Sequence, residues 1–305
     1  MPEMPEVETI KRIVEPQIVG LSIDSVITNH SQVIAYPDMY RFEQKMSGQT
    51  VNRMSRRGKY LTIHFNSGDS LVLHLRMTGQ LLVPPSDYPM ENHTHLIFNL
   101  SNGGQIRYID VRRLGRFWLF DKNEIDDKSG QEKLGIEPLD DKLTASYLVA
   151  RLGERKRPIK EILNEQSVIA GIGNIYSDEI LYAAGIYPGK KCSDLSDKEW
   201  ERLVLKIKEI LNNSIETNRM SPQEYLEGKG KEYRNMPDLK VYGQKGKACK
   251  NCGFIIEKIV IVNGSVCYFI AFFTRKFSRK KQMQCRWIKF IQPEKQFHHF
   301  GSVTS

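Results

Sequence analysis

The first twenty residues carry apolar side chains at helical spacing, with charged side chains between them. The apolar residues recur every three or four positions and so share one face: Val7, Ile10, Ile13 and Val14. We expect an amphipathic helix that starts after Pro5, packs against a core and ends at Pro16 and Gly20. Such a helix would hold the N-terminus in a defined place.

Between residues 21 and 121 the apolar spacing changes to two, which is typical of strands. Leu61, Ile63 and Phe65 alternate with other residues, and the polar turn 66–69 leads into a second alternating run. Residues 95–111 contain the turn Ser-Asn-Gly-Gly and read as another hairpin. Several short strands with regular turns predict a β-sandwich.

The polar segment 122–145 marks a boundary, and the pattern beyond it is helical. Short helices are expected at 147–152 and 159–163, and residues 203–211 form one longer amphipathic face. Residues 214–248 are polar and glycine-containing, so we expect a long loop there. The fold class is therefore α+β: an N-terminal β-sandwich flanked by helices, followed by a helical domain.

Composition narrows the function. The 305 residues suffice for two domains, and the net charge of +9 favours a polyanionic partner such as DNA or RNA. No apolar run reaches the roughly eighteen residues of a membrane helix, and no signal segment is visible, so a cytosolic protein is expected. Because disulfides are rare in the cytosol, the cysteines indicate metal binding rather than disulfides. Four of the five lie near the C-terminus: Cys249, Cys252, Cys267 and Cys285.

The N-terminus itself carries candidate chemistry. A small second residue such as Pro2 generally allows Met1 to be removed, which would expose a secondary amine beside the acid Glu3. An α-amino group titrates near ~7.7–8.0, so part of it is an uncharged nucleophile at neutral pH. Attack on a sugar carbon would give a permanently charged iminium ion, which is a strong electron sink. For an arbitrary N-terminus, disorder would be the simpler interpretation.

The first twelve residues favour an active site over disorder, because MPEMPEVETIKR resembles the N-terminus of the formamidopyrimidine-DNA glycosylases. The resemblance to this bacterial repair family extends to about residue 264. It implies a glycosylase and lyase that removes oxidised purines (8-oxoguanine and formamidopyrimidines) from duplex DNA. Pro2 would be the nucleophile, Glu3 the proton donor, and Lys59 in Arg-Arg-Gly-Lys-Tyr would assist proton transfer during β- and δ-elimination.

Further motifs carry DNA-binding roles from the same resemblance. Asn174, in AGIGNIYSDE, matches a residue of the helix–two-turn–helix element that holds phosphates. From its position it could also cap its helix and leave free N–H groups for a phosphate. The other residues expected to contact DNA are His93, Arg112, Arg113, Lys156 and Lys160.

Three residues match those that fill the space left by the flipped nucleotide. They are Met77, Arg112 and Leu114, with Arg112 facing the orphaned cytosine. Leu114 stands where the family usually has phenylalanine, and Val111 where it has proline. The wedge keeps its apolar character but loses an aromatic ring.

A zinc site is expected from the family, yet only half of it is present. Cys249 and Cys252 form one C-x2-C pair, and a tetrahedral structural site needs four ligands. The second pair is missing, and Cys267 and Cys285 have unusual spacing. Read in another frame, the codons permitted from Ser265 onward allow a family-like arginine, phenylalanine, tyrosine and cysteine, although not the final cysteine. We hypothesise a frameshift near residue 265, which the nucleotide sequence of the gene would test.

These observations divide the chain into four parts: a catalytic β-sandwich domain (1–130), a helix–two-turn–helix domain (131–235), a truncated zinc-finger remnant (236–264) and a divergent tail (265–305). We expect a cytoplasmic, nucleoid-associated monomer that binds damaged or abasic duplex DNA. Three alternatives remain: a pyrimidine-specific enzyme of the endonuclease VIII type, a paralogue that binds lesions with little turnover, and an RNA-binding protein with a ribosomal role.

Overall fold

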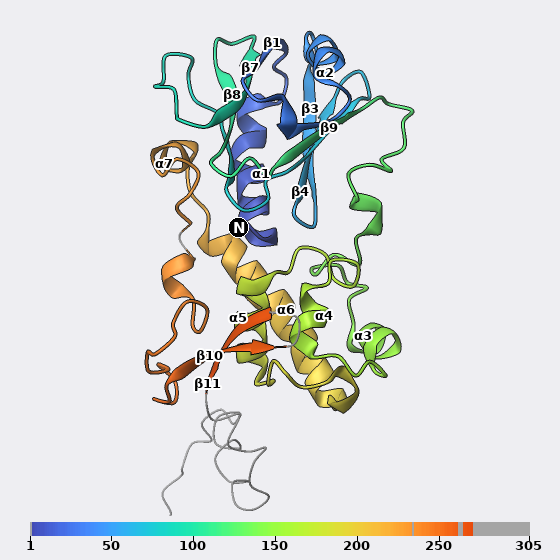
Figure 1. Cartoon of the computed structure of the whole chain (residues 1–305), viewed down its shortest axis with the longest axis vertical. Helices are drawn as coiled ribbons and strands as arrows, with labels where there is room; N and C mark the ends of the chain where they lie inside the picture. The colour runs from blue at the N-terminus through green and yellow to red at the C-terminus, as the bar shows by residue number, and fades with distance from the viewer. Residues whose placement is uncertain (1, 234, 262–264, 271–305) are drawn as a thin grey trace, which may run out of the picture.

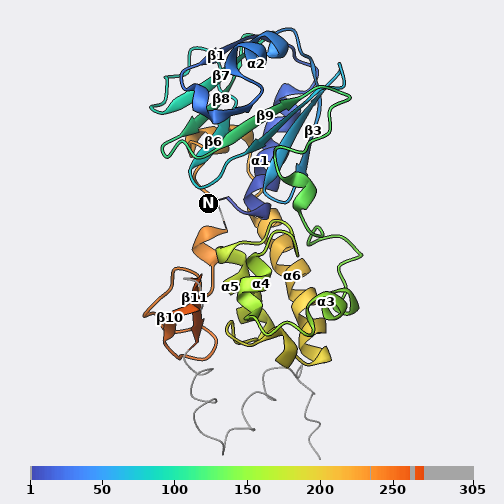
Figure 2. The same cartoon turned by 45° about the vertical axis from the view of Figure 1, so that its right-hand side comes forward.

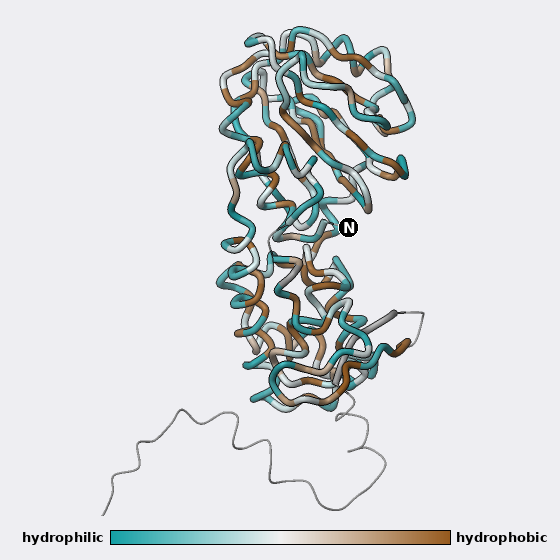
Figure 3. The backbone as a smooth tube through the Cα atoms, turned by 90° about the vertical axis from the view of Figure 1, so that its left-hand side faces the viewer, coloured by the Kyte–Doolittle hydropathy of each residue, from teal (hydrophilic) through white to brown (hydrophobic). Residues whose placement is uncertain are grey.

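The computed structural model describes residues 2–233, 235–261 and 265–270. Most strands lie in one part of the molecule and most of the longer helical segments in the other, with the N-terminus between the two parts (Figure 1). Hydrophobic segments lie on both sides of the N-terminus, in accordance with a separate core in each part (Figure 3). The expected α+β class is confirmed.

Helix α1 (Met4–Ile18) begins with a reciprocal capping box. The side chain of Glu3 accepts the backbone N–H of Glu6, and the side chain of Glu6 accepts the backbone N–H of Glu3. Its apolar face is buried as predicted, in the core of the strand-rich part. The helix runs two residues beyond the predicted stop at Pro16, and the chain turns at Gly20, which has φ +83°. A helix that is capped at its first residue holds the N-terminal segment in one orientation.

The predicted β-sandwich consists of two sheets around one core. The four-stranded sheet has the order β1-β7-β8-β6 and the five-stranded sheet the order β2-β9-β5-β4-β3. In strand β4 (Tyr60–Phe65) the alternate residues Leu61, Ile63 and Phe65 face the shared core, as the sequence predicted. The remaining strands are β1 (Ile23–Thr28), β2 (Ile34–Tyr36), β3 (Val51–Arg57), β5 (Ser70–His74), β6 (Gly79–Leu82), β7 (Thr94–Leu100), β8 (Gln105–Asp110) and β9 (Arg116–Phe120). Helix α2 (Met39–Met46), which the sequence analysis did not predict, packs beside β1.

The helical part is built around α5 (Asn174–Ala184) and the long α6 (Asp197–Thr217). The shorter helices are α3 (Ala145–Leu152), α4 (Ile159–Asn164) and α7 (Pro222–Glu227), and single 3₁₀ turns lie at Ser31–Val33, Gln131–Lys133, Cys192–Asp194 and Met236–Asp238. The prediction of an unbroken loop at 214–248 was wrong, because α6 continues to Thr217 and the Ser221–Glu224 capping box starts α7.

A hairpin of β10 (Ile256–Ile261) and β11 (Ser265–Ile270) follows the helices and lies beside α5 (Figure 2). The segment before the hairpin is anchored by the buried Glu179 of α5, whose carboxylate accepts the backbone N–H groups of Lys240, Val241 and Tyr242, each at 2.9 Å. Cys267 and Ser265 thus belong to a strand, whereas Cys285 lies outside the described residues. Among the helices that the structure describes, none has the length and apolar character needed to cross a membrane.

Candidate active site

The N-terminal segment joins the two parts of the molecule. Met4 is fully buried in the core of the helical part, and its backbone N–H donates to the carbonyl of Gly171 at 3.0 Å. The rest of α1 packs into the core of the sandwich. Pro2 and Glu3 are therefore held at the junction, where Pro2 is half-buried and Glu3 is 2% exposed.

The carboxylate of Glu3 caps α5, although 170 residues separate the two in sequence. It accepts the backbone N–H groups of Gly173 at 2.7 Å, Ile175 at 2.9 Å and Tyr176 at 3.3 Å. The expectation that Asn174 caps this helix was wrong, and two of the N–H groups expected to be free for a phosphate, those of Ile175 and Tyr176, are taken by Glu3. Gly173 is the N-cap residue, and Glu3 supplies the negative charge that favours a helix N-terminus.

Lys59 reaches the same point from the turn between β3 and β4. Its side chain is 7% exposed. Burial lowers the pKa of the ammonium group below its ordinary value, and the nearby carboxylates of Glu3 and Glu6 partly oppose this shift. A lysine whose pKa is lowered releases its proton more readily, which suits it to proton transfer.

Glycine is required where these groups meet. A Cβ atom on Gly173 would lie 2.5 Å from Glu3 Oε1 and 2.6 Å from Lys59 Nζ, so the absent side chain leaves the room that both groups occupy. On Gly171, which has φ +86°, a Cβ would lie 2.6 Å from Met4 Cβ. The two glycines of the GIG motif therefore serve close packing around the active site, which is a different role from a nucleotide loop.

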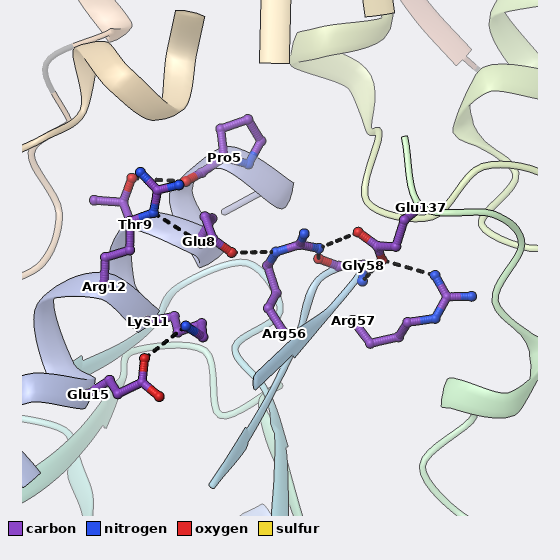
Figure 4. Close-up of polar contacts among 10 residues, drawn as sticks. All are labelled: Pro5, Glu8, Thr9, Lys11, Arg12, Glu15, Arg56, Arg57, Gly58 and Glu137. Atoms are coloured by element: carbon purple, nitrogen blue, oxygen red, sulfur yellow. Dashed lines mark hydrogen bonds and ion pairs between the residues drawn. The ribbon is translucent and has the colours of Figure 1, made fainter. Parts of the chain in front are cut away.

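Ion pairs hold the turn that carries Lys59. Arg56 donates to Glu8 of α1 at 2.9 Å and to Glu137 at 2.8 Å, and Arg57 donates to Glu137 at 2.9 Å (Figure 4). Glu137 also accepts the backbone N–H of Gly58 at 2.6 Å. The arginines of this basic motif therefore fix the turn between α1 and the segment that follows the sandwich.

A second buried acid, Glu6, lies behind Glu3. Its carboxyl group accepts the backbone N–H of Glu3 at 2.9 Å, the hydroxyl of Tyr176 at 2.5 Å and the side-chain amide of Asn235 at 3.3 Å. Burial raises the pKa of Glu6 to about 7, partly offset by the hydrogen bond from Tyr176. Glu6 was not predicted as a site residue, although the Glu3-x-x-Glu6 spacing of a capping box is visible in the sequence.

The structure brings together Met77 and Arg112, two of the three residues expected to fill the space left by the flipped nucleotide. Met77 follows β5 and is 46% exposed, and its sulfur accepts a hydrogen bond from Arg112 Nη1 at 2.9 Å. Leu114, in the loop after β8, is exposed like Arg112. Exposed apolar side chains beside a guanidinium fit insertion between bases.

The other residues expected at DNA divide into two groups. His93, Arg113, Lys156 and Asn174 are exposed. Lys160 is fully buried, and its ammonium group forms an ion pair with the equally buried Asp178. In this conformation Lys160 stabilises the contact between α4 and α5 and does not reach the surface.

The candidate zinc ligands fall short of a site in the described residues. Cys249 is buried against Val241 and Ile256, with its sulfur 3.4 Å from the hydroxyl of Tyr182, and Cys252 is exposed. No group of three potential metal ligands occurs within the described ranges. In the hairpin register Ile270 pairs with Ile256.

Comparison with known proteins agrees with this geometry. The family model "Formamidopyrimidine-DNA glycosylase N-terminal domain" matches residues 1–117, and "Formamidopyrimidine-DNA glycosylase H2TH domain" matches residues 134–225. A sandwich with a buried N-terminal acid, joined to a helix–two-turn–helix domain, defines a DNA glycosylase of the helix–two-turn–helix class.

The relatives identify the family within this class. The formamidopyrimidine-DNA glycosylase of Moorella thermoacetica is 41% identical over 259 residues, which cover 85% of this chain and 94% of the relative. That of Geobacillus kaustophilus is 39% identical, covering 88% and 98%. The solved Lactococcus lactis protein, in complex with FAPY-dG-containing DNA, matches with TM-score 0.80 and 33% identity over 88% of this chain and 98% of that one. The chain belongs to the formamidopyrimidine-DNA glycosylase family, whose members are enzymes of base excision repair.

Proposed function

We propose that this protein excises oxidised purines, 8-oxoguanine and formamidopyrimidines, from duplex DNA and then cuts the strand. The observation that carries the proposal is that Glu3, the neighbour of Pro2, meets the buried Lys59 at Gly173, so that three distant parts of the chain come together beside the N-terminus. Solved Lactococcus lactis relatives are in complex with FAPY-dG-containing DNA and with abasic-site DNA, which supports formamidopyrimidine excision and strand cleavage at abasic sites.

The chemistry follows from the groups present. After removal of Met1, the secondary amine of Pro2 attacks C1′ of the damaged nucleotide. Glu3 accepts the proton that the amine loses and passes it to the ring oxygen, so the sugar opens and the base leaves. The resulting iminium ion acidifies C2′, and loss of that proton expels the 3′ phosphate; a second elimination expels the 5′ phosphate. Lys59, with its lowered pKa, is suited to move protons in these steps.

The exposed residues supply DNA binding in this proposal. His93, Arg113, Lys156 and Asn174 contact phosphates, and Met77, Arg112 and Leu114 fill the space of the extruded nucleotide. Arg112 faces the orphaned cytosine, whose carbonyl and ring nitrogen accept guanidinium hydrogen bonds. Lys160 takes part only if its buried ion pair with Asp178 opens.

We propose that the hairpin at 256–270 holds its place without zinc. A structural zinc site needs four ligands, and the described side chains supply Cys249 and Cys252. The contacts of Glu179 and Tyr182 with the segment before the hairpin take over the anchoring. No step of the sugar chemistry above involves a metal.

Single-turnover excision assays test the proposal. Duplexes carry 8-oxoguanine opposite cytosine, an oxidised pyrimidine, or no lesion. We expect excision from the first duplex to be fastest, with none from the third. Faster excision of the pyrimidine would favour an endonuclease VIII-like specificity. Tight binding of the 8-oxoguanine duplex without base release would favour a lesion-binding paralogue, which the incomplete cysteine set makes the second candidate.

A further inference from the structure

Two exposed loops carry the residues that enter the duplex in the proposed function, and both are tied to one buried carboxylate. Met77 lies in the loop between β5 and β6, and Arg112 lies in the loop between β8 and β9. Asp110 is the last residue of β8 and is fully buried beneath them. Because Gly79, the first residue of β6, pairs with Asp110, the end of the first loop lies beside the start of the second.

Each oxygen of Asp110 accepts hydrogen bonds from these loops. Oδ1 accepts the hydroxyl of Thr78, the residue after Met77, and the backbone N–H of Arg112 at 3.1 Å. Oδ2 accepts the backbone N–H groups of Leu114 at 2.8 Å and Gly115 at 2.9 Å. One side chain therefore fixes the backbone of the Arg112 loop and the neighbour of Met77.

The site is shaped for an ionised carboxylate. The Tyr108 hydroxyl also donates to Oδ2, at 2.8 Å, so all five side-chain partners are donors. Burial alone would raise the pKa of Asp110, but the hydrogen bonds outweigh it and the pKa lies below its ordinary value. An asparagine would turn an NH₂ group toward these donors and leave several of them unpaired.

The surroundings leave these loops little freedom. A Cβ on Gly115 would lie 1.8 Å from the Tyr108 hydroxyl, and one on Gly79 would lie 3.0 Å from it. The carbonyl of Asp110 lies 2.7 Å from Nε2 of the buried His95, and its N–H donates to the carbonyl of His93 at 3.1 Å. The exposed His93 is thus joined to the same anchor. Arg113 adopts φ +57°, a strained conformation that the Asp110 contacts on both sides of it maintain.

We infer that Asp110 is a positioning residue that holds Met77 and Arg112 in a joint arrangement for entry into the duplex, so that it governs extrusion of the damaged nucleotide and not the sugar chemistry. The inference rests on the proposed function, since that function assigns Met77 and Arg112 their role. It assigns a separate role to Asp110, which touches neither the lesion nor the amine.

The test compares two reactions of Asp110→Asn. Excision of 8-oxoguanine from duplex DNA requires extrusion, whereas strand cleavage at a preformed abasic site in single-stranded DNA does not. We expect duplex excision to slow about 10- to 100-fold, the size expected for lost hydrogen bonds to a charged group, with cleavage of the single strand unchanged. Equal losses in both reactions, or no loss in duplex excision, would overturn the inference.

A second variant guards against misfolding. Thr78→Val removes only the hydroxyl that links the Met77 loop to Asp110, and Thr78→Ser restores it. We expect the valine variant to show the same selective defect and the serine variant to recover. Equal duplex excision by the valine and serine variants would count against the link between the loops.

A binding readout separates this inference from the proposed function. A duplex with a stable abasic analogue carries 2-aminopurine as the base opposite the analogue. Insertion of Met77 and Arg112 should change its fluorescence in the wild type, and the change should be smaller in Asp110→Asn. If the wild type shows the change but never cleaves DNA, the proposed function fails and the role of Asp110 stands. An unaltered change in the variant refutes that role.

Discussion

Replacing Gly173 by alanine tests whether the active site is built around the space that this glycine leaves. The backbone there has φ −135° and ψ −156°, which alanine adopts without strain. The new methyl group would lie 2.5 Å from Glu3 Oε1 and 2.6 Å from Lys59 Nζ. Each atom must retreat by about 0.8–0.9 Å to reach the ordinary contact distance of 3.4 Å.

The obstructing atoms, which also include Glu3 Cδ at 2.6 Å, all belong to the ends of side chains, so the fold should survive while the reacting groups move. A displacement near 1 Å costs on the order of 10²-fold in rate. We expect single-turnover excision of 8-oxoguanine to slow by about this factor, with unchanged affinity for an abasic-analogue duplex. Because Glu3 also caps α5, stability should fall by about 1 kcal/mol in thermal unfolding.

Gly104→Ala is the matched control. Gly104 lies in the β7–β8 turn, where a Cβ would lie 3.1 Å from Oδ1 of the exposed Asn102. This variant should excise 8-oxoguanine at the wild-type rate. An excision rate for Gly173→Ala equal to that of the control would refute the reasoning that Glu3 and Lys59 depend on this space.

Three further predictions concern the groups around the site. Because burial raises the pKa of Glu6 from 4.5 to about 7, its stabilising effect is complete below pH 4.5 and is lost as the pH rises to 7. Between pH 4 and pH 8 the wild type should lose about 3 kcal/mol of unfolding free energy through this group, and Glu6→Gln should remove that loss. Thermal unfolding at several pH values measures this, and the same pH dependence in both proteins would contradict it. Asp178→Ala should cost about 3–5 kcal/mol in denaturant unfolding because Lys160 would stay buried without its partner; a loss below about 1 kcal/mol would exclude this role. The purified protein should hold substoichiometric zinc by elemental analysis and keep its melting temperature after chelation, whereas one bound equivalent whose removal lowers that temperature would show a complete site.

Local patterns in the sequence predicted most of the fold. The spacing of Leu61, Ile63 and Phe65 gave the correct core face of β4, because alternation in a strand depends only on neighbouring residues. Helix α7 was missed because a six-residue helix between polar segments has almost no apolar period and is started by its capping box.

The site was less accessible to sequence reasoning, because its contacts join distant segments. No local pattern shows that Glu3 caps α5 across 170 residues, so Asn174 seemed the natural cap. The charge of Lys160 likewise suggested a surface position, whereas the structure shows it buried in an ion pair with Asp178. Asp110 showed no signal at all, since an acid at the end of a strand is usually solvated.

Borohydride trapping on a duplex containing 8-oxoguanine tests the central claim most directly. A secondary amine that attacks C1′ forms an iminium ion, which borohydride reduces to a stable covalent bond between protein and DNA. The wild-type protein should give a covalent adduct linked through Pro2, and Pro2→Gly should sharply lower its yield. Base excision without any trapped adduct, or an undiminished adduct with Pro2→Gly, would contradict the assignment of Pro2 as the nucleophile.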